Sequence, residues 1–325
     1  MTAVPVTVVP SDDALDPDAY LLLNDDVREA APWRRRRWAR RHFAEHGRFE
    51  GRRQYSRSGL SAVPAMRARK LDELAQRSPS LAGRTTRYGH RVLGAQMEVI
   101  IAADFEGDPR PPQRVSANHY DDDVVRFLDA DTSGLYLDLG AGLRHEYRSH
   151  VVNVDIAALA TTDVIAAGER LPFDDATFDG AVCLSVLQHV VDPFAVASEL
   201  LRVVRPGGVI VVDWAFLQPV NHYPAHLYNA TPAGAEMAFA RTDLLRESRS
   251  DVPLHMHPVF ALTWFLAEWS RGLDEDARAA FADVRVGDLV NASPHGLLDC
   301  DWVAGLSADA RERIGAGSRV WLVRR

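Results

Sequence analysis

The sequence predicts a doubly wound α/β sheet that follows a small helical module. From Gly134 onward, apolar strand-like runs alternate with amphipathic stretches, and the runs are rich in Val, Ile and Leu. Such runs are typical of parallel strands that helices cover on both faces. A glycine-rich turn follows the first run and Asp155 lies at the end of the second, which is where such sheets bind ligands. The expected strands lie within residues 135–140, 151–156, 162–167, 180–187, 209–214 and 319–325, with a crossover helix over 193–204.

Length and composition fit a globular protein with one large core and a smaller satellite. The 325 residues are 47% hydrophobic, and the longest apolar runs fall short of the roughly 20 residues that cross a bilayer. The N-terminus has no basic stretch followed by an apolar one, so neither secretion nor membrane insertion is expected. Cys183 and Cys300 are the only cysteines, which argues against a disulfide framework and makes the cytoplasm the expected compartment.

Basic charge is concentrated near the N-terminus. Residues 28–57 hold eleven arginines and three glutamates, a net charge of +8, so the rest of the chain carries −16. With Trp33, Trp38 and Phe43 interleaved, the cluster could bind nucleic acid, an anionic glycan or a membrane surface. The favoured alternative is a solvated helix face that docks on the acidic remainder of the chain.

The N-terminal residues predict two short helices. Asp16 can cap a helix that begins at Pro17, and a second helix over 33–47 should end at Gly47 in a left-handed conformation. The segments DPDAYLLLNDDV and HFAEHGRFEGR, within residues 16–52, resemble a repeat found in bacterial proteins with glycosyltransferase or cell-surface associations. That resemblance implies a glycan or envelope context and no particular reaction.

Three regions are expected along the chain. A helical basic module should occupy residues 1–58, and a helical connector should occupy 59–110, where Met66, Leu71 and Leu74 have helical spacing. Three prolines in EGDPRPPQ mark a boundary near residue 110. The sheet domain should then cover residues 111–325.

The connection after the glycine turn is short. Only residues 143–150 separate Gly142 from the next strand, and they must return across a sheet about 17 Å deep. Eight helical residues advance only about 12 Å, so we expect a partly extended connection with at most one helical turn. A pyrophosphate needs a helix N-terminus, and the third glycine of the dinucleotide fingerprint is also missing, which argues against a nicotinamide dehydrogenase. S-adenosylmethionine carries a single carboxylate instead, with which Arg144 could pair.

Five segments in register resemble the successive motifs of bacterial class I S-adenosylmethionine-dependent methyltransferases, in particular a branch with a short first connection. They are LDLGAG, VVNVDI, AAGERLPFDDATFDGAVCLSVLQHVVDPF, ELLRVVRPGGVIVV and FLQPVNHYPAHLYNATPAG. The resemblance runs from about Arg110 to about Asn291 and implies a seven-stranded Rossmann-like sheet. It implies cofactor contacts at the methionine end, the ribose and the adenine edge, from Asp138, Gly140, Ala141, Gly142, Arg144, Asp155, Ile156, Glu169 and Arg170.

Two positions depart from the family pattern. Ala167 stands where the family often has an Asp, two residues before Glu169, so adenine recognition would rest on backbone groups. Gln188 replaces the Glu of the common LEH sequence, which removes one possible carboxylate base.

Three histidines are candidate bases. His189 follows the fourth strand, and His222 and His226 lie in the loop after the fifth, where acceptors bind in this family. For His189, a structural role beneath the cofactor is an equal alternative. The segment Asn118–Tyr120 could close over the cofactor as a lid, or Asn118 or the following aspartates could cap a helix. His255 and His257 lack accompanying metal-binding carboxylates, so no metal is assigned.

The expected function is methyl transfer to a hydroxyl of a saccharide or another small metabolite, with the acceptor class implied only by the two resemblances. The alternative is a degenerate methyltransferase fold that serves as a binding or scaffolding module, because the connection is short and two family carboxylates are missing. A glycan or small-molecule acceptor is expected, rather than nucleic acid.

Overall fold

The computed structural model describes residues 2–111, 117–221, 225–240, 244–245, 247–248 and 251–315. The chain divides into two compact units: the first comprises Met1–Asp213 and Met237–Arg246, and the second comprises Trp214–Glu236 and Glu247–Arg325. The regions expected at 1–58 and 59–110 therefore form one unit with the sheet, whereas the region expected at 111–325 is divided between the units. The strand expected at 319–325 and the candidate base His222 lie outside the described residues.

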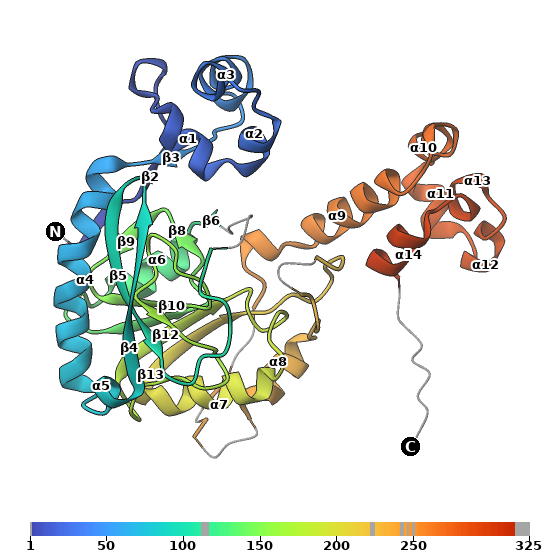
Figure 1. Cartoon of the computed structure of the whole chain (residues 1–325). Coiled ribbons are helices and arrows are strands. Elements are labelled where there is room, and N and C mark those ends of the chain that lie inside the picture. The colour runs from blue at the N-terminus through green and yellow to red at the C-terminus, as the bar shows by residue number, and fades with distance from the viewer. Residues whose placement is uncertain are drawn as a thin grey trace, which may run out of the picture. The chain divides into compact units, whose positions relative to one another are not determined.

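A mixed sheet of seven strands forms the centre of the first unit (Figure 1). Its order is β13-β12-β7-β10-β11-β5-β4, and every neighbouring pair is parallel except β4 and β5. This order confirms the predicted doubly wound α/β sheet. The strands are β4 (Thr85–Val92), β5 (Ala95–Ala102), β7 (Tyr136–Leu139), β10 (Val151–Asp155), β11 (Val164–Ile165), β12 (Phe178–Leu184) and β13 (Val204–Asp213).

The chain reverses its direction across the sheet around β7. After β7 it passes to β10 and β11 on one side, and then it returns to β12 and β13 on the other side. The carboxyl ends of β7, β10 and β12 therefore meet at a topological switch point. Open α/β sheets bind their ligands at such a point.

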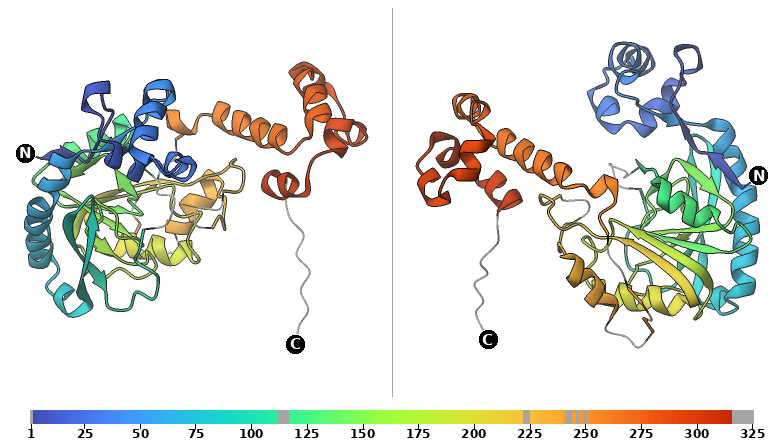
Figure 2. Two further views of the ribbon diagram at one scale, coloured as in Figure 1. Left: turned by 45° about the horizontal axis from the view of Figure 1, so that its top comes forward. Right: turned by 180° about the vertical axis from the view of Figure 1, so that it is seen from behind.

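Helices cover both faces of this sheet (Figure 2). Helix α6 (Asp122–Asp129) packs over Tyr136. Helix α7 (Pro193–Val203) places Val196 next to Gly168, and Leu139 also lies next to Gly168. Tyr136 and Leu139 are three positions apart on β7, so their side chains point to opposite faces.

The connector differs from the expected helical region, because its second half is a β-hairpin. Only α4 (Arg57–Arg77) and α5 (Leu81–Arg84) are helical, and β4 and β5 pair along all eight residues of each strand. Leu93 and Gly94 join these strands with φ of +48° and +83°. Two left-handed central residues are the mark of a tight hairpin turn whose twist matches that of the strands.

The short connection after the glycine turn is extended, as its length predicts. It contains β8 (Leu143–Arg144) and β9 (Glu146–Arg148), and no helix. β6 (Ala117–Asn118) pairs with β8, and β1 (Ala3–Pro5) pairs with β9. Strand β1 near the N-terminus thus pairs with the short connection, residues 143–150, which is extended instead of forming a crossover helix.

One apolar core joins the N-terminal residues to the sheet, which is why the module expected at 1–58 is not a separate unit. The N-terminal strand, α4 and the short connection all contribute to it. A further pair, β2 (Thr7–Val8) with β3 (Gln54–Tyr55), fastens the two ends of the module together. The shared core includes Val4, Val6, Tyr55, Leu60, Val63, Met97, Leu143 and Tyr147.

The first helix of the N-terminal module begins at Pro17 as predicted, whereas the second, expected over 33–47, begins at Arg35 and is α-helical only to His42. Asp16 caps the first helix through the N–H groups of Asp18 and Ala19. Gly47 does not adopt the predicted left-handed conformation, which belongs to Gly51 with φ of +65°. Glycine is needed at position 47 because a Cβ atom there would lie 2.2 Å from the Tyr20 hydroxyl oxygen. The elements are η1 (Asp12–Ala14), α1 (Pro17–Leu23), α2 (Asp25–Ala30), α3 (Arg35–His42) and the π-helical η2 (Phe43–Gly47).

The secondary structure of the second unit, within the residues that the structure describes, consists of helices. Trp269, Phe281 and Trp302 pack together around its core, and the Trp269 indole N–H donates to the carbonyl oxygen of Trp302. Across the described residues, no helix combines the length and the apolar character that a membrane span requires. The remaining elements are α8 (Pro232–Phe239), which crosses between the units, η3 (Leu254–Met256), α9 (Pro258–Arg271), α10 (Glu275–Ala282), α11 (Val286–Asn291), α12 (Pro294–Leu297), α13 (Asp301–Ala304) and α14 (Ala308–Ile314).

Candidate functional site

The glycine turn after β7 is fixed by the ends of two neighbouring strands. Gly140 and Gly142 adopt left-handed φ values of +67° and +58°. The N–H groups of Gly140 and Ala141 donate to the carbonyl oxygen of Val154 over 2.8 and 3.1 Å. A Cβ atom on Gly140 would lie 2.3 Å from a methyl carbon of Val186, in the loop after β12. Glycine is therefore required at position 140 both by the backbone conformation and by the close approach of that loop.

Asp155 ends β10 next to this turn, as predicted. Its Oδ2 accepts a hydrogen bond from the Gly142 N–H over 2.8 Å, and its Oδ1 accepts one from the Ala157 N–H over 3.1 Å. Burial raises the pKa of the Asp155 carboxyl group above its usual value. A carboxylate has about four lone-pair positions, so two remain for donors of a ligand. The next residue, Ile156, is 48% exposed and offers an apolar surface.

Asp138 and Arg144 are both buried and bind each other. Arg144 Nε and Nη2 donate to the two carboxylate oxygens of Asp138 over 2.7 and 3.0 Å, and the Tyr120 hydroxyl donates to Asp138 Oδ2 over 2.5 Å. Arg144 is predicted to pair with the carboxylate of a ligand, and in this structure its guanidinium pairs with the buried carboxylate of Asp138. Asp138 has no exposed surface, and its carboxylate accepts hydrogen bonds from Arg144 and Tyr120.

The segment Asn118–Tyr120 is anchored to the short connection. Asn118 pairs with Arg144 in the β6–β8 ladder, and the His119 ring lies 4.0 Å from the His145 ring. Asp121, one of the predicted aspartates, caps α6. Burial and the charge of Asp138 raise the pKa of Tyr120, so its hydroxyl stays protonated and can donate. From the sequence alone, Tyr120 could not be assigned as the partner of Asp138.

Glu169 and Arg170 follow β11 and contact different elements. Glu169 Oε1 accepts a hydrogen bond from the Val191 N–H over 3.1 Å, just before α7. Arg170 Nη1 forms an exposed ion pair with Asp104 Oδ2 at 3.1 Å. The structure thus joins Glu169 to the loop between β12 and α7.

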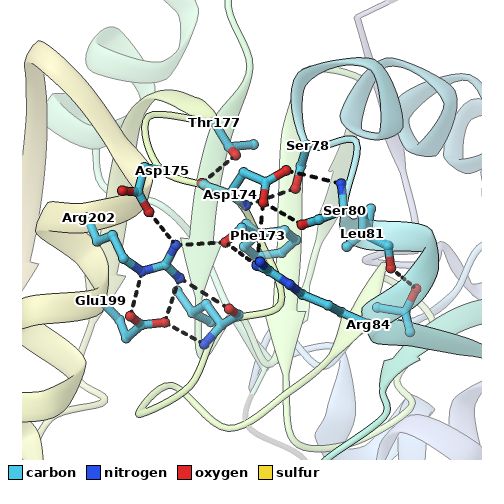
Figure 3. A network of polar contacts seen from close by, with 12 residues as sticks. Ser78, Ser80, Leu81, Arg84, Phe173, Asp174, Asp175, Thr177, Glu199 and Arg202 are labelled. Atoms are coloured by element: carbon cyan, nitrogen blue, oxygen red, sulfur yellow. Dashed lines mark hydrogen bonds and ion pairs between the residues drawn. The ribbon is translucent and has the colours of Figure 1, made fainter.

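A polar network holds the loop between β11 and β12 (Figure 3). Arg202 of α7 donates to the carbonyl oxygens of Leu171 and Phe173 over 3.2 and 2.7 Å. On the other side of the loop, Asp174 accepts a hydrogen bond from the Ser80 N–H over 3.1 Å. The loop that begins at the predicted adenine edge is therefore held by α7 and by the segment after α4.

His189 and Gln188 lie in the loop after β12, as predicted. The His189 N–H donates to the carbonyl oxygen of Val186 over 2.8 Å, and its side chain is partly exposed. Gln188 is 1% exposed, and its Oε1 has no hydrogen-bond partner among the residues that the structure describes. A buried acceptor without a partner costs about 1–3 kcal/mol, which a donor from a ligand would offset. In the sequence, Gln188 is notable only as a missing carboxylate.

His226 belongs to the second unit, whereas His189 belongs to the first. His226 Nε2 lies 2.7 Å from Asn229 Oδ1, and its Nδ1 lies 3.2 Å from the Asn221 nitrogen. Both ring nitrogens thus contact neighbours in the same loop. Of the two predicted bases that the structure describes, His189 lies in the same unit as the glycine turn and His226 does not.

One segment of the chain matches a known protein family. Residues 132–212 match the model of a family described as a methyltransferase domain. This segment begins before β7 and ends in β13, so it contains the glycine turn, Asp155, Glu169 and the loop after β12.

Curated relatives match over limited segments. An uncharacterized methyltransferase of Mycobacterium sp. (strain KMS) is 43% identical over 51 residues, which are 16% of this chain and 20% of the relative. A demethylmenaquinone methyltransferase of Paenarthrobacter aurescens (strain TC1) is 30% identical over 141 residues, which are 37% of this chain and 55% of the relative. The chain thus spans between a fifth and about half of the length of these relatives.

Solved structures give partial similarities. A S-adenosylmethionine-dependent methyltransferase of Thermotoga maritima, a possible histamine N-methyltransferase, is 23% identical with a TM-score of 0.21, over 24% of this chain and 43% of the other. Phosphoethanolamine N-methyltransferase 2 of Haemonchus contortus, in complex with S-adenosyl-L-methionine, is 16% identical with a TM-score of 0.30, over 52% of this chain and 44% of the other. The strand order is that of a Rossmann-like sheet, and residues 132–212 of the chain are similar to methyltransferase domains.

Proposed function

We propose that the first unit binds S-adenosylmethionine and transfers its methyl group to a hydroxyl of a saccharide or another small metabolite. The position of the Asp155 carboxylate is the main support for this proposal. Its carboxylate ends β10 next to the glycine turn, two backbone N–H groups orient it, and two lone-pair positions remain for the two ribose hydroxyls. The match of residues 132–212 to methyltransferase domains supports the same cofactor.

Other groups at the carboxyl ends of the strands fit a sulfonium nucleoside. Gly140 lets the loop after β12 approach the turn closely, and Gly142 has no side chain to keep a ligand from the backbone. Ile156 offers its exposed apolar side chain next to Asp155. Gln188 Oε1 is a buried acceptor that an ammonium group could satisfy.

The extended connection supports a ligand with a carboxylate rather than a pyrophosphate. Residues 143–148 contain β8 and β9, so no helix N-terminus follows the glycine turn. A dinucleotide would therefore lack the partial positive charge that usually holds its pyrophosphate. We assign Arg144 a positioning role, in which its bond to Asp138 fixes the end of β7.

Catalysis requires the chain to align the acceptor and to take up its proton. When bound, S-adenosylmethionine supplies the activated methyl group. His189 is the proposed base in the first unit, because its partly exposed side chain follows β12 at the same end of the sheet as Asp155. His222 and His226 stay candidates for the acceptor side, and the contacts of His226 with Asn229 favour a structural role for it.

One observation favours the alternative, a binding module without turnover. Asp138 and Arg144, two of the predicted cofactor contacts, are closed off by binding each other. The two functions differ in turnover and not in cofactor affinity, so binding and activity need separate measurements.

Calorimetric titration of the full chain with S-adenosylmethionine tests the cofactor. Asp155→Asn should weaken binding at least about tenfold, because the amide keeps the shape but loses the charge that strengthens hydrogen bonds from hydroxyls. Asp72→Asn makes the same change at an exposed position of α4 and should bind like the wild-type protein. No binding by the wild-type protein, or equal affinities of all three proteins, would contradict the assignment.

Transfer of a radiolabelled methyl group to a panel of saccharides and small alcohols tests the reaction. We expect turnover with at least one acceptor, and His189→Gln should lower kcat without changing the affinity for S-adenosylmethionine. Binding without turnover on every acceptor would favour the scaffolding alternative.

A further inference from the structure

We propose that the N-terminal module holds a second ligand site, for a nucleoside diphosphate, at the start of α3. The site is formed by Asp18, Trp33, Arg34, Arg35, Arg36 and Arg37, which line a hollow of about 440 Å³. These residues are here called the arginine site. It is independent of methyl transfer, because none of its members belongs to residues 132–212.

The first observation is the distribution of ion pairs in the module. Six arginines of the module are paired with the module's own acids, and Arg53 instead donates to the Thr7 hydroxyl and carbonyl oxygens. The ion pairs therefore do not show the expected docking of a basic helix face on the acidic remainder of the chain. The paired arginines are Arg28, Arg36, Arg41, Arg48, Arg52 and Arg57, and their partners are Asp12, Asp16, Asp18, Asp25, Asp26, Glu45 and Glu50.

Four arginines are different. Arg34, Arg35, Arg37 and Arg40 are all exposed, and within the described part of the chain none of them forms an ion pair with a carboxylate. Arg37 and Arg40 are three positions apart on α3, so their like charges are neighbours and repel each other, and Arg34 directly precedes this helix as its N-cap residue. An anion between them would remove this repulsion.

The second observation is Trp33, which is 82% exposed. The guanidinium carbon of Arg34 lies 4.3 Å from the centre of the Trp33 ring. Large aromatic side chains are usually buried, and an exposed one next to arginines is a typical platform for stacking a flat ring. Together, the exposed Trp33 ring and the arginines without ion pairs would best bind a ligand that has both a flat ring and negative charge.

Asp18 adds an acceptor to the arginine site. Its carboxylate is held by Arg36, whose Nε and Nη2 donate over 2.9 and 2.6 Å. A carboxylate held in this way can accept hydrogen bonds from hydroxyl or amino groups. A nucleoside diphosphate has all three features: a base for Trp33, hydroxyls or an amino group for Asp18, and phosphates for the planar guanidinium groups.

Size and charge favour a small ligand over a polymer. A hollow of about 440 Å³ is within the usual range of small-molecule sites, roughly 300–1,000 Å³. The chain outside residues 28–57 carries a net charge of −16, which would repel a long polyanion that extends beyond the module.

Calorimetric titration of the full chain with uridine diphosphate tests this site, with S-adenosylhomocysteine present in excess to occupy the proposed cofactor site. We expect binding by the wild-type protein and at least about tenfold weaker binding by the double variant Arg34→Gln/Arg37→Gln, since it removes two charge-assisted contacts. Trp33→Ala should weaken uridine diphosphate at least about fivefold and leave inorganic pyrophosphate unchanged, because only the stacked base is lost.

Arg41→Gln is the matched control. Arg41 lies on α3 but is paired with Glu45, so this variant should bind uridine diphosphate within about twofold of the wild-type protein. Absence of binding, an equal loss in Arg41→Gln, or no effect of Trp33→Ala would overturn the proposal. Tighter, Trp33-dependent binding of an oligothymidylate or of phosphatidylserine vesicles would overturn it in favour of a nucleic acid or a membrane. The affinity for S-adenosylmethionine should be unchanged in all these variants, which separates this test from that of the cofactor site.

Discussion

Lys70 and Asp163 form an ion pair that is entirely buried, with 2.7 Å between Lys70 Nζ and Asp163 Oδ2. Arg67 Nε donates to Asp163 Oδ1 over 3.1 Å, and the Tyr147 hydroxyl donates to the same oxygen. Lys70 Nζ also donates to the carbonyl oxygen of Val151 over 2.5 Å. These contacts join α4 to the short connection and to the start of β10, so the position of the glycine turn depends on them.

Asp163→Asn should destabilise the protein strongly. The change leaves two buried cations without an anion, for which about 3–5 kcal/mol of unfolding free energy is the usual loss. Urea unfolding followed by circular dichroism measures it, with Asp72→Asn as the exposed control. A loss below about 1 kcal/mol would mean that the buried network contributes little.

Lys70 should make stability depend on pH in the alkaline range. Burial lowers the pKa of Lys70 to about 8, from 10.5 when it is exposed. Between these values the unfolded chain binds more protons than the folded one, so the unfolding free energy should rise with pH. From pH 8 to pH 9.5 the rise from this group is about 1.5 kcal/mol. Urea unfolding across this range should show that rise for the wild-type protein relative to Lys70→Gln, and parallel curves would contradict it.

This buried network could not be predicted from the sequence. Lys70 and Asp163 are 93 positions apart, and long charged side chains are usually exposed. The pairing of Arg144 with Asp138 could not be predicted from the sequence for a different reason. A residue next to a glycine turn can face a ligand or turn inward, and only the packing of Tyr120 and β6 decides between them.

Simple geometry predicted the parts that position the site. Apolar runs predicted five strands of the sheet and one crossover helix, and the extended form of residues 143–150 follows from their number. The hairpin of β4 and β5 was missed although Leu93 and Gly94 mark its turn. Its first strand, TTRYGHRV, has polar residues on much of its length, and a strand at the edge of a sheet needs no continuous apolar run.

Gly140→Ala should disrupt both stability and cofactor binding. The new Cβ atom would lie 2.3 Å from a methyl carbon of Val186, and alanine is strained at a φ of +67°. We expect a loss of about 2–4 kcal/mol in urea unfolding, of which a second change, Val186→Ala, restores the part due to the clash. Gly83→Ala, where the added atom meets nothing within 4 Å, should leave stability nearly unchanged. Equal stabilities of the Gly140 and Gly83 variants would contradict this account.

A double-mutant cycle at positions 138 and 144 separates two roles of Arg144. The variants are made on a Tyr120→Phe background, so that the Tyr120 hydroxyl is not left without its acceptor when Asp138 is changed. Arg144→Met leaves the buried carboxylate of Asp138 unpaired and should cost about 3–5 kcal/mol, whereas the double variant Asp138→Leu/Arg144→Met removes both charges and should be more stable than the single variant. If Arg144 only positions the end of β7, calorimetry should show that the double variant also recovers affinity for S-adenosylmethionine. If Arg144 instead binds the carboxylate of the cofactor, stability will recover and affinity will not, because a leucine at position 138 cannot replace the lost cation.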